Sequence, residues 1–264
     1  MEKTQLVNLQ QWFDTYLKGM YGSDEFINAN LKLKEEHCIR TASEMRYLAD
    51  SLNLPQEEKY LAEAIGLLHD IGRFEQFVVY QTYNDGRSTN HGRLGIKVLR
   101  EDFVLEGIDQ QEMSVIETSV EYHGVKLVPS GLSGKRLQFT RLIRDADKID
   151  IFVVVRDNYK QYLADPQKYH IEIEFPLKGG CSPEIINAVL KGEPVDYRLV
   201  RSMDDFRLLQ MGWVFDMNFV PSIRRVKERG LLDEIAQMLP QNPDVQGAVQ
   251  RIMSYVEERL AKAV

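Results

Sequence analysis

The sequence contains few of the features that mark secreted, membrane-embedded or zinc-stabilised proteins. It has only two cysteines in 264 residues, Cys38 and Cys181, and they form no close-spaced pair of the kind that binds zinc. The longest apolar candidate, "IDIFVVV", contains Asp150 and is far shorter than the ~20 residues that a membrane span requires. The N-terminus lacks the apolar core and the cleavage site of a secretory signal. We therefore expect a cytoplasmic protein in a reducing compartment, with no membrane association.

An excess of basic charge is also missing. The chain has 33 Lys and Arg against 40 Asp and Glu, which gives a formal net charge of -7. Because non-specific nucleic-acid binding needs a basic surface that releases counterions, we expect no binding to nucleic-acid polymers. A small anionic ligand in a local basic pocket stays compatible with this charge. Hydrophobic residues make up 44% of the chain, as in an ordinary globular protein with one large domain or a main domain and an appendage.

Most of the sequence shows the apolar period of amphipathic helices, and it predicts an all-α fold. Asp24 is placed to cap one helix, and Pro55 to occupy the first turn of the next. Gly72 and Gly124 follow predicted helix ends, where a left-handed residue is often needed. The predicted helices cover residues 4–19, 24–51, 56–70, 91–102, 109–123, 136–163, 182–191, 203–218 and 244–262.

Three segments depart from the helical pattern. Residues 77–90, "FVVYQTYNDGRSTN", predict a long connection with an Asp-Gly turn. Residues 168–180, "KYHIEIEFPLKGG", alternate polar and apolar side chains and leave room for one short strand or hairpin. Gly192 and Pro194 indicate a linker. We predict a helical core over residues 1–163 and a mostly helical C-terminal extension over residues 164–264 that packs on the core; one continuous domain is an equally tenable interpretation.

Polar side chains occupy helix faces that the apolar pattern assigns to the core. With an advance of about 100° per residue, His37 lies within about 40° of Leu33 and Leu48. His69 projects beside Ile65 in the same way, and Asp70 follows it directly. The same projection places three more polar residues on apolar sides of their helices: His91, His123 and Asp147. Four of the five histidines of the chain therefore face the predicted core.

A bound cation is one way to compensate these buried groups. A buried carboxylate without a partner costs several kcal/mol or loses its charge, whereas a divalent ion keeps carboxylates ionised and imidazoles neutral. Each histidine alone could instead be a hydrogen-bonded core residue, and Asp147 could pair with Arg144 or Lys148. Asp145 and Asp150 project elsewhere, so we expect them to face solvent or to cap local charges.

The order of these residues resembles the HD superfamily of metal-dependent phosphohydrolases, in its two-metal branch. "LLHDIGRF" is similar to the central motif of that family and "RDADKID" to its closing aspartate motif. "NHGRLG" and "EYHG" are similar to the motifs of its two additional histidines. The resemblance covers roughly residues 24–160, and residues 165–264 resemble nothing familiar. It implies an all-α, phosphodiesterase-like HD-domain bundle in which the metal ligands converge from five helices.

The resemblance also implies a set of metal ligands. Carried over position by position, it has one ion held by His37, His69, Asp70 and Asp147, and a second ion held by His91 and His123, with Asp70 bridging both. Mixed imidazole and carboxylate ligands suit two divalent transition ions, either iron, manganese, cobalt or zinc. Two such ions ~3.5–4 Å apart can activate a water molecule and clamp a phosphoryl group.

Cations near these motifs are candidate substrate ligands. Arg73 stands where the family often has a lysine, three residues after Asp70, and its guanidinium can bind phosphate through two hydrogen bonds. A surface salt bridge from Arg73 to Glu75 is the alternative. Lys126 and Lys148 are further candidates, with a solvated surface lysine as the alternative for each. The single histidine of "EYHG" argues against a third metal, and the absence of a "GYP" signature argues against a cyclic-dinucleotide substrate.

These observations predict a metal-dependent phosphohydrolase. We expect it to cleave a phosphate ester or anhydride of a small nucleotide-like substrate through a water activated by two metals, with Asp70 and Arg73 as catalytic residues. Two other functions stay open: a di-iron oxygenase of the inositol oxygenase type, which has a similar six-ligand pattern, and a non-catalytic nucleotide-binding signalling module. The sequence leaves the substrate, the metal and the formation of a homo-oligomer undecided.

Overall fold

A computed structural model of the chain describes residues 1–168, 170–172, 175–176 and 179–262. The described residues form helices and loops without a strand, which confirms the predicted all-α fold. The α-helices are α1 (Lys3–Met20), α2 (Glu25–Ser51), α3 (Gln56–Leu68), α4 (Gly72–Tyr80), α5 (His91–Glu101), α6 (Gln110–Tyr122), α7 (Gly134–Ala164), α8 (Pro183–Lys191), α9 (Met203–Gly212), α10 (Val220–Glu228), α11 (Leu231–Met238) and α12 (Pro243–Ala261). Short 3-10 turns are η1 (Asp85–Arg87), η2 (Pro166–Lys168), η3 (Tyr197–Leu199) and η4 (Trp213–Asp216).

The chain divides into two compact units. Unit 1 comprises Met1–Asp150 and Asp165–Glu172, and unit 2 comprises Ile151–Ala164 and Ile173–Val264. Helix α7 contributes to both units, because the division falls within it. The predicted domain boundary at residue 163 lies near the end of the same helix and stays a prediction. None of the helices in the described part of the chain combines the length and the apolar character that crossing a membrane demands.

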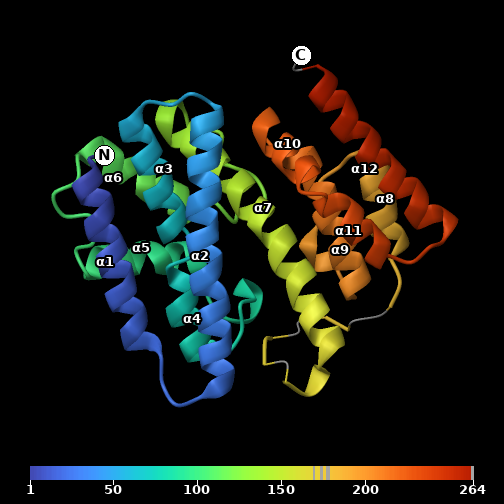
Figure 1. The fold of residues 1–264 in the computed structure, drawn as a ribbon, viewed down its shortest axis with the longest axis horizontal. Helices are drawn as coiled ribbons and strands as arrows, with labels where there is room; N and C mark the ends of the chain where they lie inside the picture. Colours follow the sequence, from blue (N-terminus) through green and yellow to red (C-terminus); the bar gives the residue numbers. More distant parts are fainter. Residues whose placement is uncertain (169, 173–174, 177–178, 263–264) are drawn as a thin grey trace. The chain divides into compact units, whose positions relative to one another are not determined.

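Unit 1 is built on the close packing of α2 against α3, which run side by side in Figure 1. Asp24 caps α2 as predicted, since its carboxylate accepts a hydrogen bond from the Ile27 amide at 3.0 Å. Gly66 of α3 touches the backbone of α2: a Cβ atom there would lie 2.6 Å from Ala42 Cα. Only glycine allows this approach. It brings the second half of α3, and the residues that follow it, against the middle of α2.

Helix α4 begins against the start of α5. A Cβ atom on Gly72 would lie 2.3 Å from the carbonyl oxygen of His91, so the two helix starts touch through backbone. The sequence predicted a connection over residues 77–90. Its first four residues, 77–80, belong instead to α4, so the connection is shorter than predicted. Phe74 and Phe77 of this helix are fully buried, and Gln81 ends it in the left-handed region at φ 52°. A helix of nine residues gives only two turns of periodic pattern, too few to stand out in the sequence.

Unit 2 contains two helices that the sequence prediction missed. Helices α10 and α11 occupy residues between 219 and 243, for which no helix was predicted. Each has at most nine residues, so its periodic signal is as short as that of α4. The predicted helix over residues 203–218 is also shorter, since α9 ends at Gly212 and the 3-10 turn η4 follows.

The predicted hairpin over residues 168–180 falls partly outside the described residues. Residues 169, 173–174, 177 and 178 are not described, and the described residues of this segment carry no strand. Residues 165–172 belong to unit 1, where Glu172 and the backbone of His170 contact the helical core. The segment therefore returns to unit 1 after the end of α7.

Candidate metal centre

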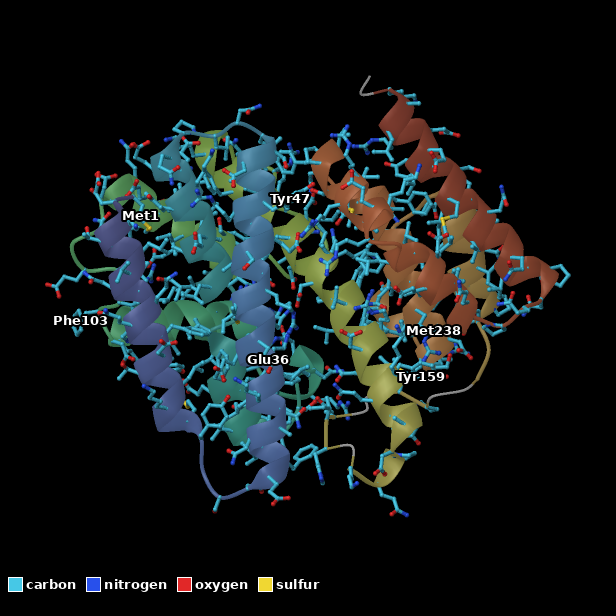
Figure 2. The ribbon with its side chains drawn as sticks, viewed as in Figure 1. Met1, Glu36, Tyr47, Phe103, Tyr159 and Met238 are labelled. Carbon is cyan, nitrogen blue, oxygen red and sulfur yellow. The ribbon has the colours of Figure 1, made fainter. Side chains whose placement is uncertain are left out.

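Two pairs of histidines meet inside unit 1. His37 lies midway along α2, one residue after Glu36 (Figure 2), and His69 follows the last turn of α3. Their Nε2 atoms lie 3.2 Å apart. His91 opens α5 and His123 follows α6, and their Nε2 atoms lie 3.1 Å apart. All four imidazoles are buried, with exposed fractions of at most 6%.

Asp70 lies between the two pairs and turns one oxygen toward each. Its Oδ2 lies 3.6 Å from Nε2 of His37 and 3.7 Å from Nε2 of His69. Its Oδ1 lies 3.3 Å from Nε2 of His123 and 3.7 Å from Nε2 of His91. This is the arrangement of a carboxylate that bridges two ions.

Asp147 of α7 completes the first pair. Its Oδ1 lies 3.1 Å from Nε2 of His37 and 3.6 Å from Nε2 of His69. The structure thus gathers all six residues that the sequence proposed as metal ligands. Their ligand atoms form three groups within 4.8 Å: His37, His69 and Asp70; His69, His123 and Asp147; and Asp70, His91 and His123.

The outer nitrogen of each imidazole faces an acceptor. Nδ1 of His69 lies 2.8 Å from the carbonyl oxygen of Gly66, and Nδ1 of His123 lies 2.8 Å from that of Val120. Since a carbonyl oxygen only accepts, these hydrogen bonds assign the proton to Nδ1 and leave Nε2 with a free lone pair.

For the other two imidazoles, the acceptor that faces Nδ1 is a carboxylate. Nδ1 of His37 lies 2.7 Å from Asp150 Oδ2, and Nδ1 of His91 lies 2.7 Å from Asp85 Oδ2. Cations in turn hold these aspartates: Arg40 Nε lies 2.7 Å from Asp150 Oδ1, and Arg73 Nη1 lies 2.8 Å from Asp85 Oδ1. Such partners fix the tautomer and the orientation of a metal-binding histidine.

The inward side of the cluster consequently brings acceptors against acceptors, although Asp70 Oδ2 also meets a lysine, Lys34, at 2.7 Å. Four Nε2 lone pairs and the oxygens of Asp70 and Asp147 approach one another at 3.1–3.7 Å. Buried acceptors at these separations are unfavourable unless a cation lies among them. Ligand atoms about 2.1 Å from a shared ion lie about 3.0–3.4 Å apart. The separations of 3.1–3.3 Å fall in this range, and those of 3.6–3.7 Å are slightly longer than it, so small movements would bring the donor set around divalent transition ions.

The pKa shifts agree with charged carboxylates at Asp70 and Asp147 and with neutral imidazoles at His69 and His91. Burial would raise the pKa of Asp70, but Lys34 and the surrounding imidazoles hold it well below its usual value. Burial opposes ionisation of Asp147 as well, and the adjacent imidazoles of His37 and His69 bring its pKa well below the usual value. Burial lowers the pKa of His69. His37 differs: burial lowers its pKa, but Asp147 and Asp150 outweigh this effect and raise it overall.

His91 shows the same tendency as His69. Burial and the nearby cation of Arg73 lower its pKa to about 4, although the hydrogen bond to Asp85 acts in the opposite direction. The imidazole of His91 is therefore neutral near pH 7 and available as a ligand.

The predicted positions of Asp150 and Asp145 were wrong. Both were expected to face solvent or to cap local charges, yet Asp150 is 1% exposed and Asp145 is fully buried. The expectation assumed that α7 buries a single stripe, whereas its buried residues extend well beyond the stripe of Phe139, Ile143 and Ala146. Residues on other sides of the helix are also buried: Thr140, Arg144, Asp145 and Phe152. Asp150 also lies only about 60° from Asp147 in projection, close enough to reach the same histidine.

Lys34 is a further residue that the sequence analysis missed. Its Nζ lies 2.7 Å from Oδ2 of Asp70, and its side chain is 16% exposed. It precedes His37 by three residues and so projects to the same side of α2, which was a usable signal. Lysines are so often solvated that this signal carried little weight.

Arg73 also lies beside the cluster. Its Nε is 3.6 Å from Asp70 Oδ1, while Nη1 donates to Asp85 and to Gln76, at 2.8 Å each. The alternative partner Glu75 instead lies 3.6 Å from Lys97. The role of Arg73 toward a substrate stays a prediction.

The two other candidate lysines differ in exposure. Lys126 lies in the loop after His123 and is exposed, and Lys148 on α7 is half-buried beside Asp147. Their predicted contacts with a substrate also stay predictions.

Backbone contacts support His91 and His123. A Cβ atom on Gly124 would lie 3.2 Å from Nε2 of His91, so only a glycine leaves this ring undisturbed. Nη1 of Arg144, from α7, donates to the carbonyl oxygens of His123 and Val125. These contacts fix the end of α6 against the cluster.

Comparison with known proteins identifies one family. Residues 35–152 match the family model of the HD domain. No curated protein and no solved structure matches the chain. All six clustered residues lie inside the matched range, from His37 to Asp147. The predicted resemblance is therefore confirmed over residues 35–152, which match the HD domain and are consistent with the HD superfamily of metal-dependent phosphohydrolases.

Proposed function

We propose that this protein hydrolyses a phosphate ester or anhydride of a small, nucleotide-like substrate at a two-metal centre. The observation that carries the proposal is the position of Asp70, which turns one oxygen toward each histidine pair. A single-ion site would need only one of these pairs. Asp147 joins the pair of His37 and His69, so each half of the centre leaves positions open for water and substrate.

Two divalent transition ions, when bound, would supply Lewis acidity and would lower the pKa of water between them. The ligands assigned to them are His37, His69, Asp70 and Asp147 for one ion and His91, His123 and Asp70 for the other. Two carboxylates against two divalent ions leave a net positive charge. This charge favours an anionic phosphoryl group.

The outer hydrogen bonds prepare the centre for this role. Asp150 and Asp85 hold the Nδ1 protons of His37 and His91, and backbone carbonyl groups hold those of His69 and His123. Each imidazole therefore keeps its proton on the outer side and its lone pair on the inner side during turnover.

Lys34 and Arg73 supply cations for the substrate. Both lie against Asp70, and Nε of Arg73 is buried without a hydrogen-bond partner among the described residues. We assign both side chains to the transferred phosphoryl group, with Lys126 and Lys148 as further contacts. In the net reaction one water molecule adds across a phosphorus–oxygen bond: its oxygen bonds to phosphorus, and the leaving oxygen takes a proton.

The test is phosphate release by protein loaded separately with manganese, iron, cobalt or zinc. Substrates would include p-nitrophenyl phosphate, bis-p-nitrophenyl phosphate and nucleoside mono- and triphosphates. Asp70→Ala should lower turnover by at least about 10³-fold. Asp14→Ala, which changes an exposed aspartate of α1, is the matched control. Undiminished phosphate release from Asp70→Ala would refute the assignment.

Two other results would reassign the centre. Oxygen consumption by the iron-loaded protein with a polyol or a phosphonate, without phosphate release, would indicate the di-iron oxygenase alternative. Tight nucleotide binding without turnover under any metal would indicate a signalling module.

A further inference from the structure

A second network of contacts joins residues 170–172, the loop after α4 and helix α2, all within unit 1. The Glu172 carboxylate accepts from Thr82 Oγ1 at 2.6 Å and from the Tyr83 amide at 3.0 Å. The Glu172 amide donates to Asn30 Oδ1 at 3.0 Å, and Asn30 Nδ2 donates to the carbonyl oxygen of His170 at 2.9 Å. Asn30 is fully buried and Thr82 is 8% exposed, whereas Glu172 itself is half-buried.

The network positions the ring of Tyr83 beside the candidate metal centre. The Tyr83 hydroxyl donates to the backbone oxygen of Asn30 at 2.8 Å, and the ring packs against Phe77 at 4.5 Å between centroids. Lys34 Nζ lies 5.2 Å from the centre of the same ring, and the guanidinium carbon of Arg73 lies 6.0 Å from it.

The two cations that flank Tyr83 are the ones that reach Asp70. Lys34 lies 2.7 Å from Asp70 Oδ2, and Arg73 lies 3.6 Å from Asp70 Oδ1. A lysine side chain has four rotatable bonds, and contact with an aromatic ring restricts where its ammonium group lies. A displacement of the Tyr83 ring would therefore change the position of both cations at once.

We propose that Glu172 is a positioning residue for phosphate binding: it fixes Tyr83 as the aromatic platform that holds Lys34 and Arg73 beside the metal centre. This inference rests on the proposed function. Glu172 and Asn30 lie outside the matched range 35–152, so this hydrogen-bond network extends beyond the residues that match the HD domain. Through Glu172 the segment after α7 contributes to the affinity for substrate, although it supplies no ligand to the metals.

Charge and hydrogen-bonding capacity make Glu172 specific for this task. Its two oxygens accept from two different donors of adjacent residues, Thr82 and Tyr83. A glutamine offers only one oxygen, so one donor would lose its acceptor and would face an amide NH₂ group. The backbone at Tyr83 would then lose its fixed position.

The experiment uses the full chain loaded with metal and compares Glu172→Gln with the wild type. Inorganic phosphate is the probe, measured both by calorimetric binding and as a competitive inhibitor of hydrolysis. We expect Glu172→Gln to weaken phosphate binding about tenfold and to raise KM to a similar extent. The metal content per chain should not change, and kcat should change less than KM.

Matched variants separate positioning from general damage. Glu101→Gln makes the same chemical change at a 63% exposed side chain and should leave phosphate binding unchanged. Thr82→Val removes the other partner of the carboxylate and should weaken binding in the same direction. Tyr83→Leu should weaken phosphate binding more than Tyr83→Phe, because only phenylalanine keeps the aromatic ring.

The outcomes distinguish this inference from the proposed function. If the wild type binds metal and phosphate but hydrolyses no phosphate ester, the proposed function fails, and the binding data still test Glu172. Wild-type phosphate affinity in folded, metal-loaded Glu172→Gln and Thr82→Val would overturn the inference, as would the absence of phosphate binding by the wild type. If Glu172→Gln does not fold, the test is the comparison of Tyr83→Leu with Tyr83→Phe. Equal phosphate affinities of these two variants would overturn the inference.

Discussion

Both units bury a cluster of charged side chains, but the two clusters balance their charges differently. In unit 2, Arg207 of α9 is 1% exposed, donates to Asp204 Oδ1 at 2.9 Å and lies 3.9 Å from the ring centre of Tyr159 (Figure 2). Asp205 accepts from the Ser182 amide at 2.6 Å, from Ser182 Oγ at 2.8 Å and from the Arg201 amide at 3.0 Å. In unit 1, by contrast, four imidazole lone pairs and two carboxylates face one another.

The difference separates a structural network from a candidate binding centre. In unit 2 every carboxylate oxygen of Asp204 and Asp205 meets a donor of the chain, and the surplus is one of donors, because Nε and Nη2 of Arg207 have no partner among the described residues. In unit 1 the surplus is one of acceptors. A network that pairs acceptors with its own donors supports the fold, whereas a surplus of nitrogen and oxygen acceptors calls for a cation.

Asp70→Ala should break the unit 1 cluster most severely. We expect both ions to be lost together and hydrolysis to fall at least about 10³-fold, because the carboxylate that turns one oxygen toward each histidine pair is removed. The metal-free variant should remain folded, since one acceptor fewer relieves the cluster. Elemental analysis and circular dichroism check this. Retention of both ions by the variant would contradict the bridging role.

In unit 2, by contrast, we expect Asp205→Ala to lower the stability of the fold and to leave metal binding unchanged. We expect the free energy of unfolding to fall by about 2–4 kcal/mol, because the amides of Ser182 and Arg201 and the hydroxyl of Ser182 lose their acceptor. Urea unfolding measures this change. The metal content per chain should stay that of the wild type, and a loss of metal would erase the distinction between the two clusters.

The sequence predicted the residues that form the unit 1 cluster, but it did not predict their supports. His37, His69 and Asp147 could be identified because a polar residue on an apolar helix face is unusual. The order of the motifs also resembled a known family. Asp85 lies in the short 3-10 turn η1 of the connection after α4, where no periodic pattern indicates which way a side chain points. Asp150 lies on a helix whose buried residues extend beyond one stripe, so projection on a single stripe misplaced it.

Long-range contacts were also beyond the sequence. Glu172 meets Thr82 across 90 residues, and no local pattern connects them. The helices α10 and α11 were missed because two turns of apolar pattern distinguish a helix from a loop only weakly, although the equally short α8 was predicted. The overall all-α fold was predictable because most of the other helices are longer, and several of them, such as α2 at Asp24 and α6 at Asp109, begin at a capping residue.

Asp150→Asn and Asp85→Asn should sharpen the comparison by separating the two halves of the metal centre. Each asparagine keeps one acceptor but loses the charge that supports a ligand histidine, His37 in one case and His91 in the other. We expect each variant to weaken the affinity of the protein for one of the two ions by about 10–100-fold. Chelator competition, followed ion by ion, measures this. Loss of the same ion in both variants would show that the two halves are not independently supported.

The smallest effect is expected for a charge pair outside both clusters. Arg100 is 66% exposed and contacts Glu117 through two hydrogen bonds, at 2.7 and 3.0 Å. Because solvent and salt screen an exposed pair, Arg100→Gln should change the free energy of unfolding by at most about 0.5 kcal/mol. Thermal unfolding and metal analysis test this. A larger loss, or a change in metal content, would mean that exposed charges matter as much as the buried clusters.

The central claim is that the six residues of unit 1 form a site for two ions. The most direct measurement is the identity and number of metal ions in protein purified without added metal or chelator, under exclusion of oxygen. The account predicts about two transition ions per chain in the wild type and none in Asp70→Ala. A wild-type protein that contains no metal and takes none up on titration would contradict the account, because the buried acceptors would then have to satisfy one another.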